Sequence, residues 1–214
     1  MRTTERFQGG GSGGFSSFIF GTVAGQDRDP AEVRGLLAHE ALHSFTGSGG
    51  TGGQWYSEGS TSYYTIVLPY RAELTRLEDV QKSFNDLARA YYTNPRSNLA
   101  NDEVTRLFFS DPDAQVVPYQ RGPIYFALVD ARMRAASGGQ RRVDELILRF
   151  IARPSDVDSV AYWRELVAEA LGPAGATEFD NMMAGAPLDL PADLLGPCFR
   201  GEAQPLARFS LGFR

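Results

Sequence analysis

Residues 30–45, PAEVRGLLAHEALHSF, decide the predicted fold, because they have the pattern of one long helix. Asp29 can cap this helix, Pro30 suits its first turn, and Glu32 favours its positive end. An apolar stripe that should face the core comprises Val33, Leu36, Leu37, Leu42 and Phe45. The sequence therefore predicts a helix that runs to about residue 45.

The segments on either side of this helix differ in character. Upstream, residues 9–14 are GGGSGG, and residues 15–23, FSSFIFGTV, have the apolar and aromatic character of a strand. Downstream, residues 46–53, TGSGGTGG, predict a flexible loop. Further helices are expected over residues 54–68, 71–92, 119–136, 142–152, 156–171 and 174–184, with a proline-broken stretch over 93–118 and an extended tail over 197–214. We therefore expect a mainly α protein, in which a glycine-rich and strand segment (residues 1–25) precedes a mostly helical region (residues 26–214).

The composition narrows the classes of function. The 214-residue chain has a net charge of −5 and no block of like charges, which argues against nucleic-acid binding. Cys198 is the only cysteine, so neither an intramolecular disulfide nor a cysteine-based zinc site is expected. No apolar run is long enough for a membrane span. The N-terminus lacks the apolar core of a signal peptide, and its early glycines suggest a chain that begins partway through a longer protein. The compartment is thus undecided: cytoplasmic by default, exported if a longer precursor exists.

The helix predicted over residues 30–45 contains the pattern His39-Glu40-Ala41-Leu42-His43. Residues four apart on a helix lie on one face, so both imidazoles can bind one ion, and neutral imidazole suits Zn²⁺. Glu40 lies about 100° around the helix from His39, which favours a role as general base over a role as ligand. The alternative is that both histidines are ordinary, partly buried helix residues.

A catalytic zinc usually has three protein ligands, and the chain has no third histidine. The third ligand should therefore be a carboxylate. Glu58 is the best candidate, because it follows the glycine loop and lies near the start of the next helix. We expect one Zn²⁺ per chain, held by His39, His43 and Glu58.

Two of these segments together resemble a known group. The motif HEALH (residues 39–43), followed by WYSEGSTSYY (residues 55–64), is similar to the gluzincin peptidases, in particular the glycyl aminopeptidase family and its relatives around alanyl aminopeptidase. The resemblance implies a thermolysin-like lobe, a peptide or protein substrate and hydrolysis by a zinc-activated water. It also implies ligand roles for His39, His43 and Glu58, and a general-base role for Glu40.

A third segment extends the resemblance. Residues 117–122, VPYQRG, are similar to the Tyr-x-Lys-Gly segment of these enzymes, with Arg121 in place of the usual lysine. The resemblance implies that Tyr119 donates a hydrogen bond to the oxyanion of the reaction. The alternative is that Tyr119 is a packing or capping aromatic residue.

The chain also departs from the family. Fourteen residues separate His43 from Glu58, a shorter gap than in the alanyl aminopeptidase branch. The Gly-Ala-Met-Glu-Asn type of segment that holds the substrate amine there is missing, which puts exopeptidase activity in doubt. The glycine run stands in its place. Gly11, Gly13 and Gly14 are predicted to lie along the substrate backbone as an edge strand, with a flexible linker as the equal alternative.

Other residues have weaker claims. Ser62 could orient a histidine ligand one helical turn after Glu58. Asp102, Glu103 and Asp130 are more often caps or solvated charges than supports of a metal ligand. Side chains expected mainly in packing are Trp55, Tyr63, Tyr64, Leu146, Ile147, Phe150 and Ile151. Two other functions compete with peptide hydrolysis: a metallopeptidase-like module that binds a protein partner, and a zinc hydrolase of a non-peptide substrate.

Overall fold

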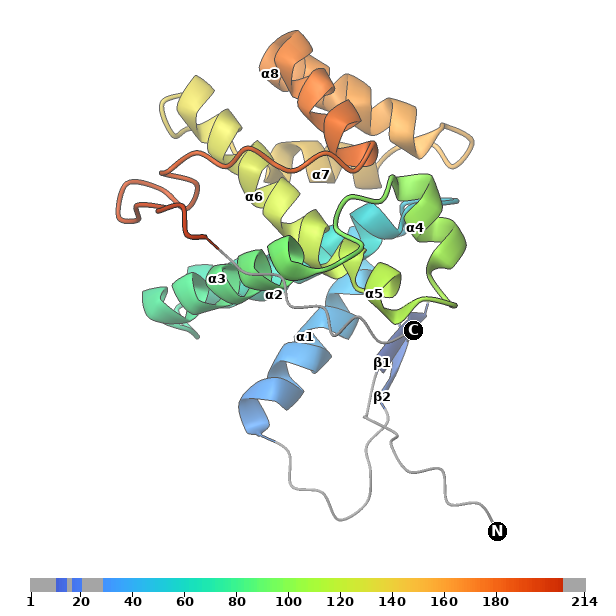
Figure 1. The fold of residues 1–214 in the computed structure, drawn as a ribbon, viewed down its shortest axis with the longest axis horizontal. Coiled ribbons are helices and arrows are strands. Elements are labelled where there is room, and N and C mark those ends of the chain that lie inside the picture. The colour runs from blue at the N-terminus through green and yellow to red at the C-terminus, as the bar shows by residue number, and fades with distance from the viewer. Residues whose placement is uncertain (1–10, 15–16, 21–28, 206–214) are drawn as a thin grey trace.

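The computed structural model describes residues 11–14, 17–20 and 29–205, and of residues 11–14, 17–20 and 30–31 it describes the backbone only. Within these residues the protein is mainly α, as expected, with helices α1–α8 and one small hairpin (Figure 1). The predicted boundary at residue 25 falls outside the described residues. No helix in the described part is long and apolar enough to cross a membrane.

The hairpin precedes the helices. Strands β1 (Gly11–Gly14) and β2 (Ser17–Phe20) pair antiparallel, with Gly11 opposite Phe20 and Gly14 opposite Ser17. Strand structure thus covers the middle of the predicted strand and also part of the glycine run, whereas residues 15–16 and 21–23 lie outside the description. The hairpin packs against α1.

Helices α1 (Pro30–Thr46) and α2 (Gln54–Arg71) confirm the two helices predicted around the glycine loop. Gly47, Gly50 and Gly52 all adopt positive φ in this loop, a conformation that L side chains rarely adopt. The loop is also tied to a distant part of the chain. Arg153 donates to the Ser48 carbonyl at 2.9 Å, and the Ser159 hydroxyl donates to the Gly49 carbonyl. The glycines therefore shape a turn, and hydrogen bonds from Arg153 and Ser159 hold the middle of that turn in place.

Helix α6 (Val117–Ala136) lies at the centre of the fold and contacts α2, α3 (Leu77–Thr93) and α8 (Ser159–Met183). Its contact with α2 is the closest. A Cβ added to Gly122 would lie 2.4 Å from Gly59 Cα, and one added to Gly59 would lie 2.7 Å from Gly122 Cα. The two helix backbones therefore touch at this pair of glycines. Buried aromatic rings surround the crossing: Trp55, Tyr56, Tyr125, Phe126, Phe150, Trp163 and Phe179.

The remaining helices match the predicted ones with shifted boundaries. The proline-broken stretch contains α4 (Asn101–Leu107) and α5 (Pro112–Gln115), and α7 spans Asp144–Ile151. The two helices predicted near the C-terminus are merged in α8 across a kink at Gly172, where φ is 73°, followed by Pro173. The tail is non-helical up to residue 205, where the description ends.

Three details of the predicted packing are wrong. Helix α3 begins at Leu77 rather than at residue 71, because Glu73 takes a positive φ of 58° and the Arg76 backbone N–H is capped by the Asp79 carboxylate at 2.8 Å. Leu74 is consequently outside the helix and 79% exposed. Phe45 and Ile151 were assigned to the core, but they are 72% and 39% exposed.

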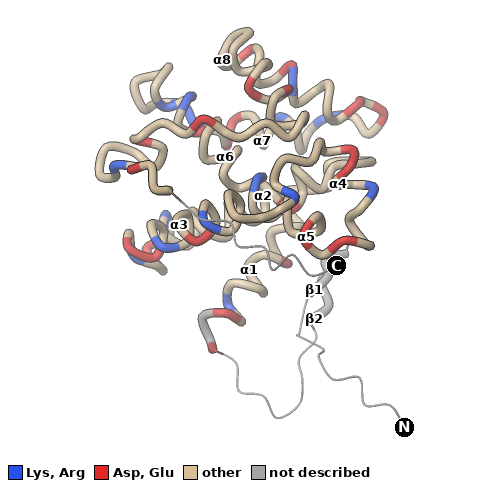
Figure 2. The backbone as a smooth tube through the Cα atoms, in the orientation of Figure 1, with Lys and Arg blue, Asp and Glu red and all other residues tan. Residues whose placement is uncertain are grey.

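Charged residues are distributed as the composition predicts. Acidic and basic side chains are interspersed along α3 (Figure 2). Several are paired on the surface, for example Lys82 with Asp86 and Arg164 with Asp180. Such exposed pairs contribute about 0–1 kcal/mol each to stability, so the aromatic core carries most of the fold.

Candidate metal centre

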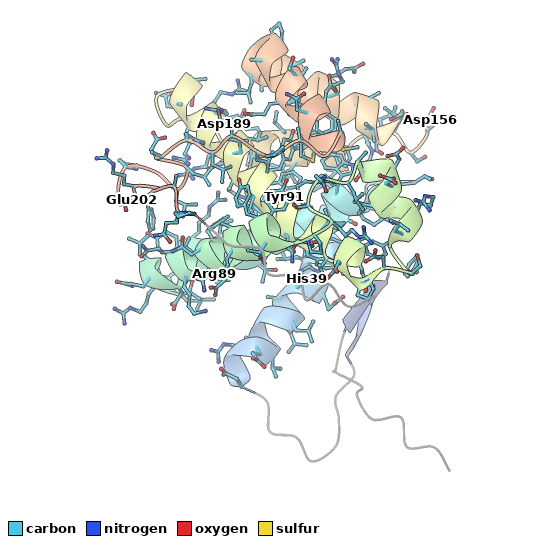
Figure 3. All side chains as sticks on the ribbon, viewed as in Figure 1. His39, Arg89, Tyr91, Asp156, Asp189 and Glu202 are labelled. Atoms are coloured by element: carbon cyan, nitrogen blue, oxygen red, sulfur yellow. The ribbon has the colours of Figure 1, made fainter. Side chains whose placement is uncertain are left out.

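His39 lies where α1 joins the helical body (Figure 3). The three predicted ligands meet there, because the ligand atoms of His39, His43 and Glu58 lie within 4.8 Å of one another. His39 and His43 are four residues apart on α1, so their rings project from one face. The glycine loop reverses the chain and packs α2 against α1, which brings Glu58 to the same place. The convergence therefore follows from helical spacing on α1 and from one turn between two helices.

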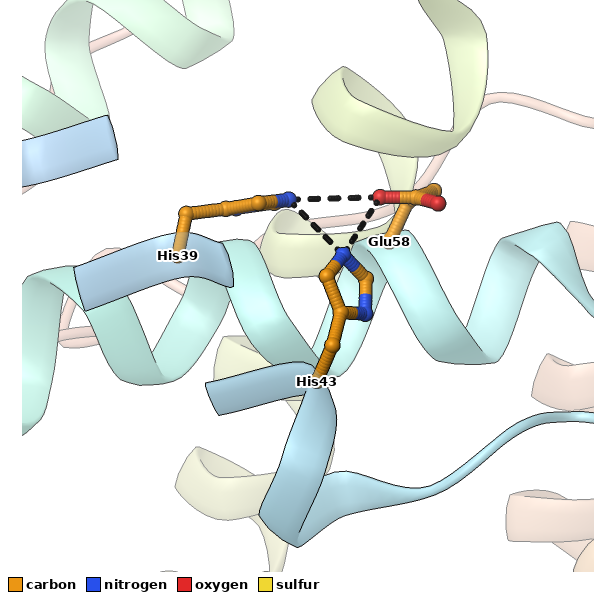
Figure 4. A group of neighbouring side chains, drawn as sticks. All are labelled: His39, His43 and Glu58. Carbon is orange, nitrogen blue, oxygen red and sulfur yellow. Dashed lines mark hydrogen bonds and ion pairs between the residues drawn. The ribbon is translucent and has the colours of Figure 1, made fainter. Parts of the chain in front are cut away.

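The ligand atoms form a nearly equilateral triangle (Figure 4). His39 Nε2 lies 3.3 Å from Glu58 Oε2, His43 Nε2 lies 3.3 Å from the same oxygen, and the two Nε2 atoms are 3.2 Å apart. Tetrahedral ligands bound to zinc at 2.0–2.1 Å are separated by about 3.3–3.4 Å. The edges of the triangle thus match the ligand spacing of a tetrahedral zinc site, and two imidazoles with one carboxylate are a donor set that zinc accepts.

The electrostatics of the triangle favour bound positive charge. Burial alone would raise the pKa of Glu58, but the two histidines, each with its Nε2 3.3 Å from Glu58 Oε2, lower it to about 2. The pKa of His43 is raised: burial lowers it, and the Glu58 carboxylate more than compensates, with a smaller contribution from Glu40. Glu58 is therefore ionised, and a cation beside it, whether a proton on His43 or a metal ion, is stabilised.

Glu40 is a buried residue of α1. Its side chain is only 5% exposed, although it follows a ligand histidine directly in the sequence. Its charge helps to raise the pKa of both His43 and Tyr119, so it lies near both groups. A buried carboxylate is costly unless it is near positive charge, so its position beside the ligand triangle suits a proton-transfer role.

Tyr119 also belongs to this cluster. Its ring stacks on His39, with centroids 5.8 Å apart and an interplanar angle of 25°. Burial raises the pKa of Tyr119. The Glu58 carboxylate raises it further through its charge and through a hydrogen bond with the phenol, and the charge of Glu40 adds to this effect. The phenol therefore stays protonated and able to donate a hydrogen bond.

The glycine crossing explains how Tyr119 and Glu58 come together. Glu58 immediately precedes Gly59, and Tyr119 lies one helical turn before Gly122. Because α2 and α6 touch at these two glycines, the ligand and the phenol are set side by side. The glycines after Glu58 and Arg121 in the two motifs thus have a packing function that the sequence did not reveal.

Thr61 is a site residue that sequence reasoning missed. Its hydroxyl oxygen lies 3.3 Å from His43 Nδ1, the ring nitrogen that faces away from the triangle. Ser62 was considered for such a role, but the contact to His43 comes from its neighbour. Residues three apart on a helix share a face, so the spacing from Glu58 to Thr61 was an available signal.

The other candidates lie elsewhere or have structural partners. Asp130 accepts from Arg134 at 2.9 Å and from the Val143 backbone N–H at 3.1 Å, and Asp102 and Glu103 are exposed on α4. Trp55, Tyr63 and Tyr64 are core residues, as expected. Arg121 is 1% exposed and donates to the Leu99 carbonyl at 2.8 Å.

The predicted substrate glycines belong to the hairpin. Gly11, Gly13 and Gly14 lie in β1, which packs against α1, the helix that carries both histidines. This position is compatible with an edge strand beside the cluster.

Comparison with known proteins adds no assignment: no family model matches the chain, and no curated protein matches it.

Proposed function

We propose that this chain is the zinc-binding lobe of a hydrolase that cleaves peptide bonds. The observation that supports this most directly is the triangle of His39, His43 and Glu58, whose edges of 3.2–3.3 Å match the ligand spacing of tetrahedral zinc. Three protein ligands leave one coordination position for water or substrate, which distinguishes catalytic from structural zinc sites. Zinc bound there would acidify water and polarise a carbonyl group.

The neighbouring residues would supply the rest of the chemistry. The Glu40 carboxylate accepts the proton of the attacking water and later delivers it to the leaving amine. The Tyr119 phenol, which stays protonated, donates a hydrogen bond to the oxyanion that develops during attack. Both groups face the ligand triangle, so one substrate carbonyl can be served by all of them.

The fold and the substrate class are part of the same proposal. A thermolysin-like lobe accounts for a ligand-bearing helix, a turn and a second ligand-bearing helix in this order. β1 would present backbone groups to an extended peptide, because among the described residues it pairs with β2 alone and keeps its other edge free. Glycines at that edge would let the substrate backbone approach β1 closely. The type of enzyme we propose is aminopeptidase-like.

The test combines metal analysis with activity. The purified chain is analysed for zinc and assayed on a panel of fluorogenic peptides and aminoacyl substrates, with and without a chelator. We expect one zinc per chain and hydrolysis that chelation abolishes and zinc restores. Glu40→Gln should keep the zinc and lose about 10²–10⁴-fold in kcat, the range for a general base. Glu165→Gln, on the exposed side of α8, is the matched control and should leave kcat unchanged.

The outcomes separate this proposal from its competitors. Hydrolysis that survives complete zinc removal would falsify it. Stoichiometric zinc without hydrolysis of any peptide would favour either a binding module or a hydrolase of another substrate class. If Glu40→Gln has an unchanged kcat, the proposed zinc site stands, but Glu40 is not the general base.

A further inference from the structure

A buried chain of hydroxyl groups links His43 to the backbone of its own helix. His43 Nδ1 lies 3.3 Å from Thr61 Oγ1, Thr61 Oγ1 lies 3.1 Å from Thr46 Oγ1, and Thr46 Oγ1 donates to the Leu42 carbonyl at 3.1 Å. Thr61 is fully buried and Thr46 is 3% exposed. The chain therefore crosses from α1 to α2 and returns to α1 with little access to water.

The direction of this chain can be deduced from its last link. A carbonyl oxygen only accepts, and a threonine hydroxyl has one proton to donate. Because Thr46 uses its proton on Leu42, it can only accept from Thr61. Thr61 then has no proton left for His43, so the proton between them must belong to His43 Nδ1. The chain thus specifies the tautomer of His43 in which Nδ1 carries hydrogen.

This tautomer is the one that a metal site at the triangle needs. With the proton on Nδ1, the lone pair of His43 is on Nε2, the atom that faces His39 and Glu58. In the metal-free protein this lone pair can accept from His39 Nε2–H at 3.2 Å. Hydrogen bonding at the distal nitrogen also fixes the orientation of the ring. Thr46 is itself held in place by a second contact, because the Tyr56 hydroxyl donates to the Thr46 carbonyl at 3.0 Å.

We infer that Thr61 is a positioning residue for the centre: through the hydroxyl chain to Thr46 and Leu42, it selects the Nδ1–H tautomer of His43 and aims Nε2 at the metal position. The inference rests on the proposed zinc site for its purpose. The tautomer itself, however, is a property of the metal-free protein and can be measured without zinc or substrate.

The first measurement is made on the metal-free protein. Nitrogen-15 NMR of the two histidine rings, at a pH that keeps them neutral, reports which nitrogen of His43 carries the proton. We expect the wild type to hold the Nδ1–H form and Thr61→Val, which removes the hydroxyl with little change in shape, to populate both tautomers. Thr61→Ser keeps the hydroxyl and should restore the single form. Thr65→Val is the matched control, because Thr65 lies one turn further along α2 and donates to the Thr61 carbonyl at 2.9 Å.

The second measurement is zinc affinity, obtained by competition with a chelator. Thr61→Val should bind zinc about 10–100-fold more weakly, the usual effect of removing a partner of a metal-ligating histidine. Thr61→Ser and Thr65→Val should bind as the wild type does. If Thr61→Val does not fold, Thr46→Val provides the same test, because it frees the Thr61 proton for His43 and should mix the tautomers.

The results distinguish the two proposals. If the wild type binds no zinc, the proposed function fails, and the tautomer measurement still decides the role of Thr61. If the wild type binds zinc, and Thr61→Val (or Thr46→Val) shows a single tautomer with wild-type affinity, the positioning role is overturned. Loss of affinity that Thr61→Ser does not rescue also contradicts it, because the effect would then not come from the hydroxyl.

Discussion

The two halves of the candidate centre are held in place in different ways. Glu58 and Tyr119 belong to α2 and α6, whose backbones touch at Gly59 and Gly122 inside a cluster of buried rings. His39, His43 and Glu40 belong to α1, which extends away from the helical body in Figure 1. Most residues of α1 are only partly buried, and Phe45 near its end is 72% exposed.

The contrast teaches how the site is assembled. The α2–α6 half is fixed by close packing, which changes little without unfolding the core. The α1 half is attached by its packing on α2, where Leu42 lies partly buried against the core, by polar contacts of Thr46 with Tyr56 and Thr61, by the hairpin and by the ligand triangle itself. A metal ion would therefore act as a cross-link between a rigid half and a more weakly attached half.

The largest expected effect comes from breaking the rigid half. Gly122→Ala would place a Cβ 2.4 Å from Gly59 Cα, a distance that only separation of the two helix backbones can relieve. We expect a loss of about 3 kcal/mol or more in the free energy of unfolding, measured by urea denaturation, because overpacking costs about 1–3 kcal/mol even where side chains can adjust.

The control for this substitution lies on α1. A Cβ at Gly35 meets nothing within 4 Å. Gly35→Ala should therefore stabilise the protein by about 0.5–1 kcal/mol through helix propensity alone. Equal stability of the Gly122→Ala protein and the wild type would show that the helices do not cross as described.

Zinc should strengthen the weaker half. At a free concentration one hundredfold above its Kd, zinc should raise the free energy of unfolding by about 2.7 kcal/mol. Hydrogen–deuterium exchange should slow mainly in α1 and at the start of α2, because those segments carry the ligands. His43→Ala is the control and should show neither effect. Equal protection across α6 and α8 would contradict the division into two halves.

A smaller effect is expected where α1 is attached to α2. Tyr56→Phe removes the hydrogen bond to the Thr46 carbonyl and keeps the buried ring, which should cost about 1 kcal/mol. Zinc affinity should fall as well, because Thr46 supports the chain to His43. Tyr92→Phe removes a comparable bond to the Leu188 carbonyl, far along the sequence, and should lower stability without changing zinc affinity. If Tyr56→Phe and Tyr92→Phe bind zinc with equal affinity, the hydrogen bond from Tyr56 to Thr46 does not support the zinc site.

The sequence predicted those parts of the site that depend on local spacing. Helix α1 followed from Pro30 and the capping pattern, the pairing of His39 with His43 from the helical repeat, and Glu58 from the lack of a third histidine. Such features are set within one helix or across one turn. They need no knowledge of how distant helices pack.

The parts that the sequence did not predict depend on contacts between distant segments. The crossing of Gly59 with Gly122 joins residues far apart in the chain, and a glycine within a helix pattern gives no sign of its partner. Thr61 was missed in favour of Ser62, because the rotation of α2 against α1 decides which hydroxyl meets His43. Phe45 was misassigned, because periodicity within one helix predicts its apolar face but not which residues of that face another element covers.

The partial exposure of the ligands has a practical consequence. The side chains of His39, His43 and Glu58 are 15%, 18% and 16% exposed, so an ion can reach them without disruption of the aromatic core. Exchange of metals should then need no denaturant. Cobalt, which binds such donors more weakly than zinc does, could be introduced under mild conditions. Its visible absorption would report the coordination number of the centre directly in solution.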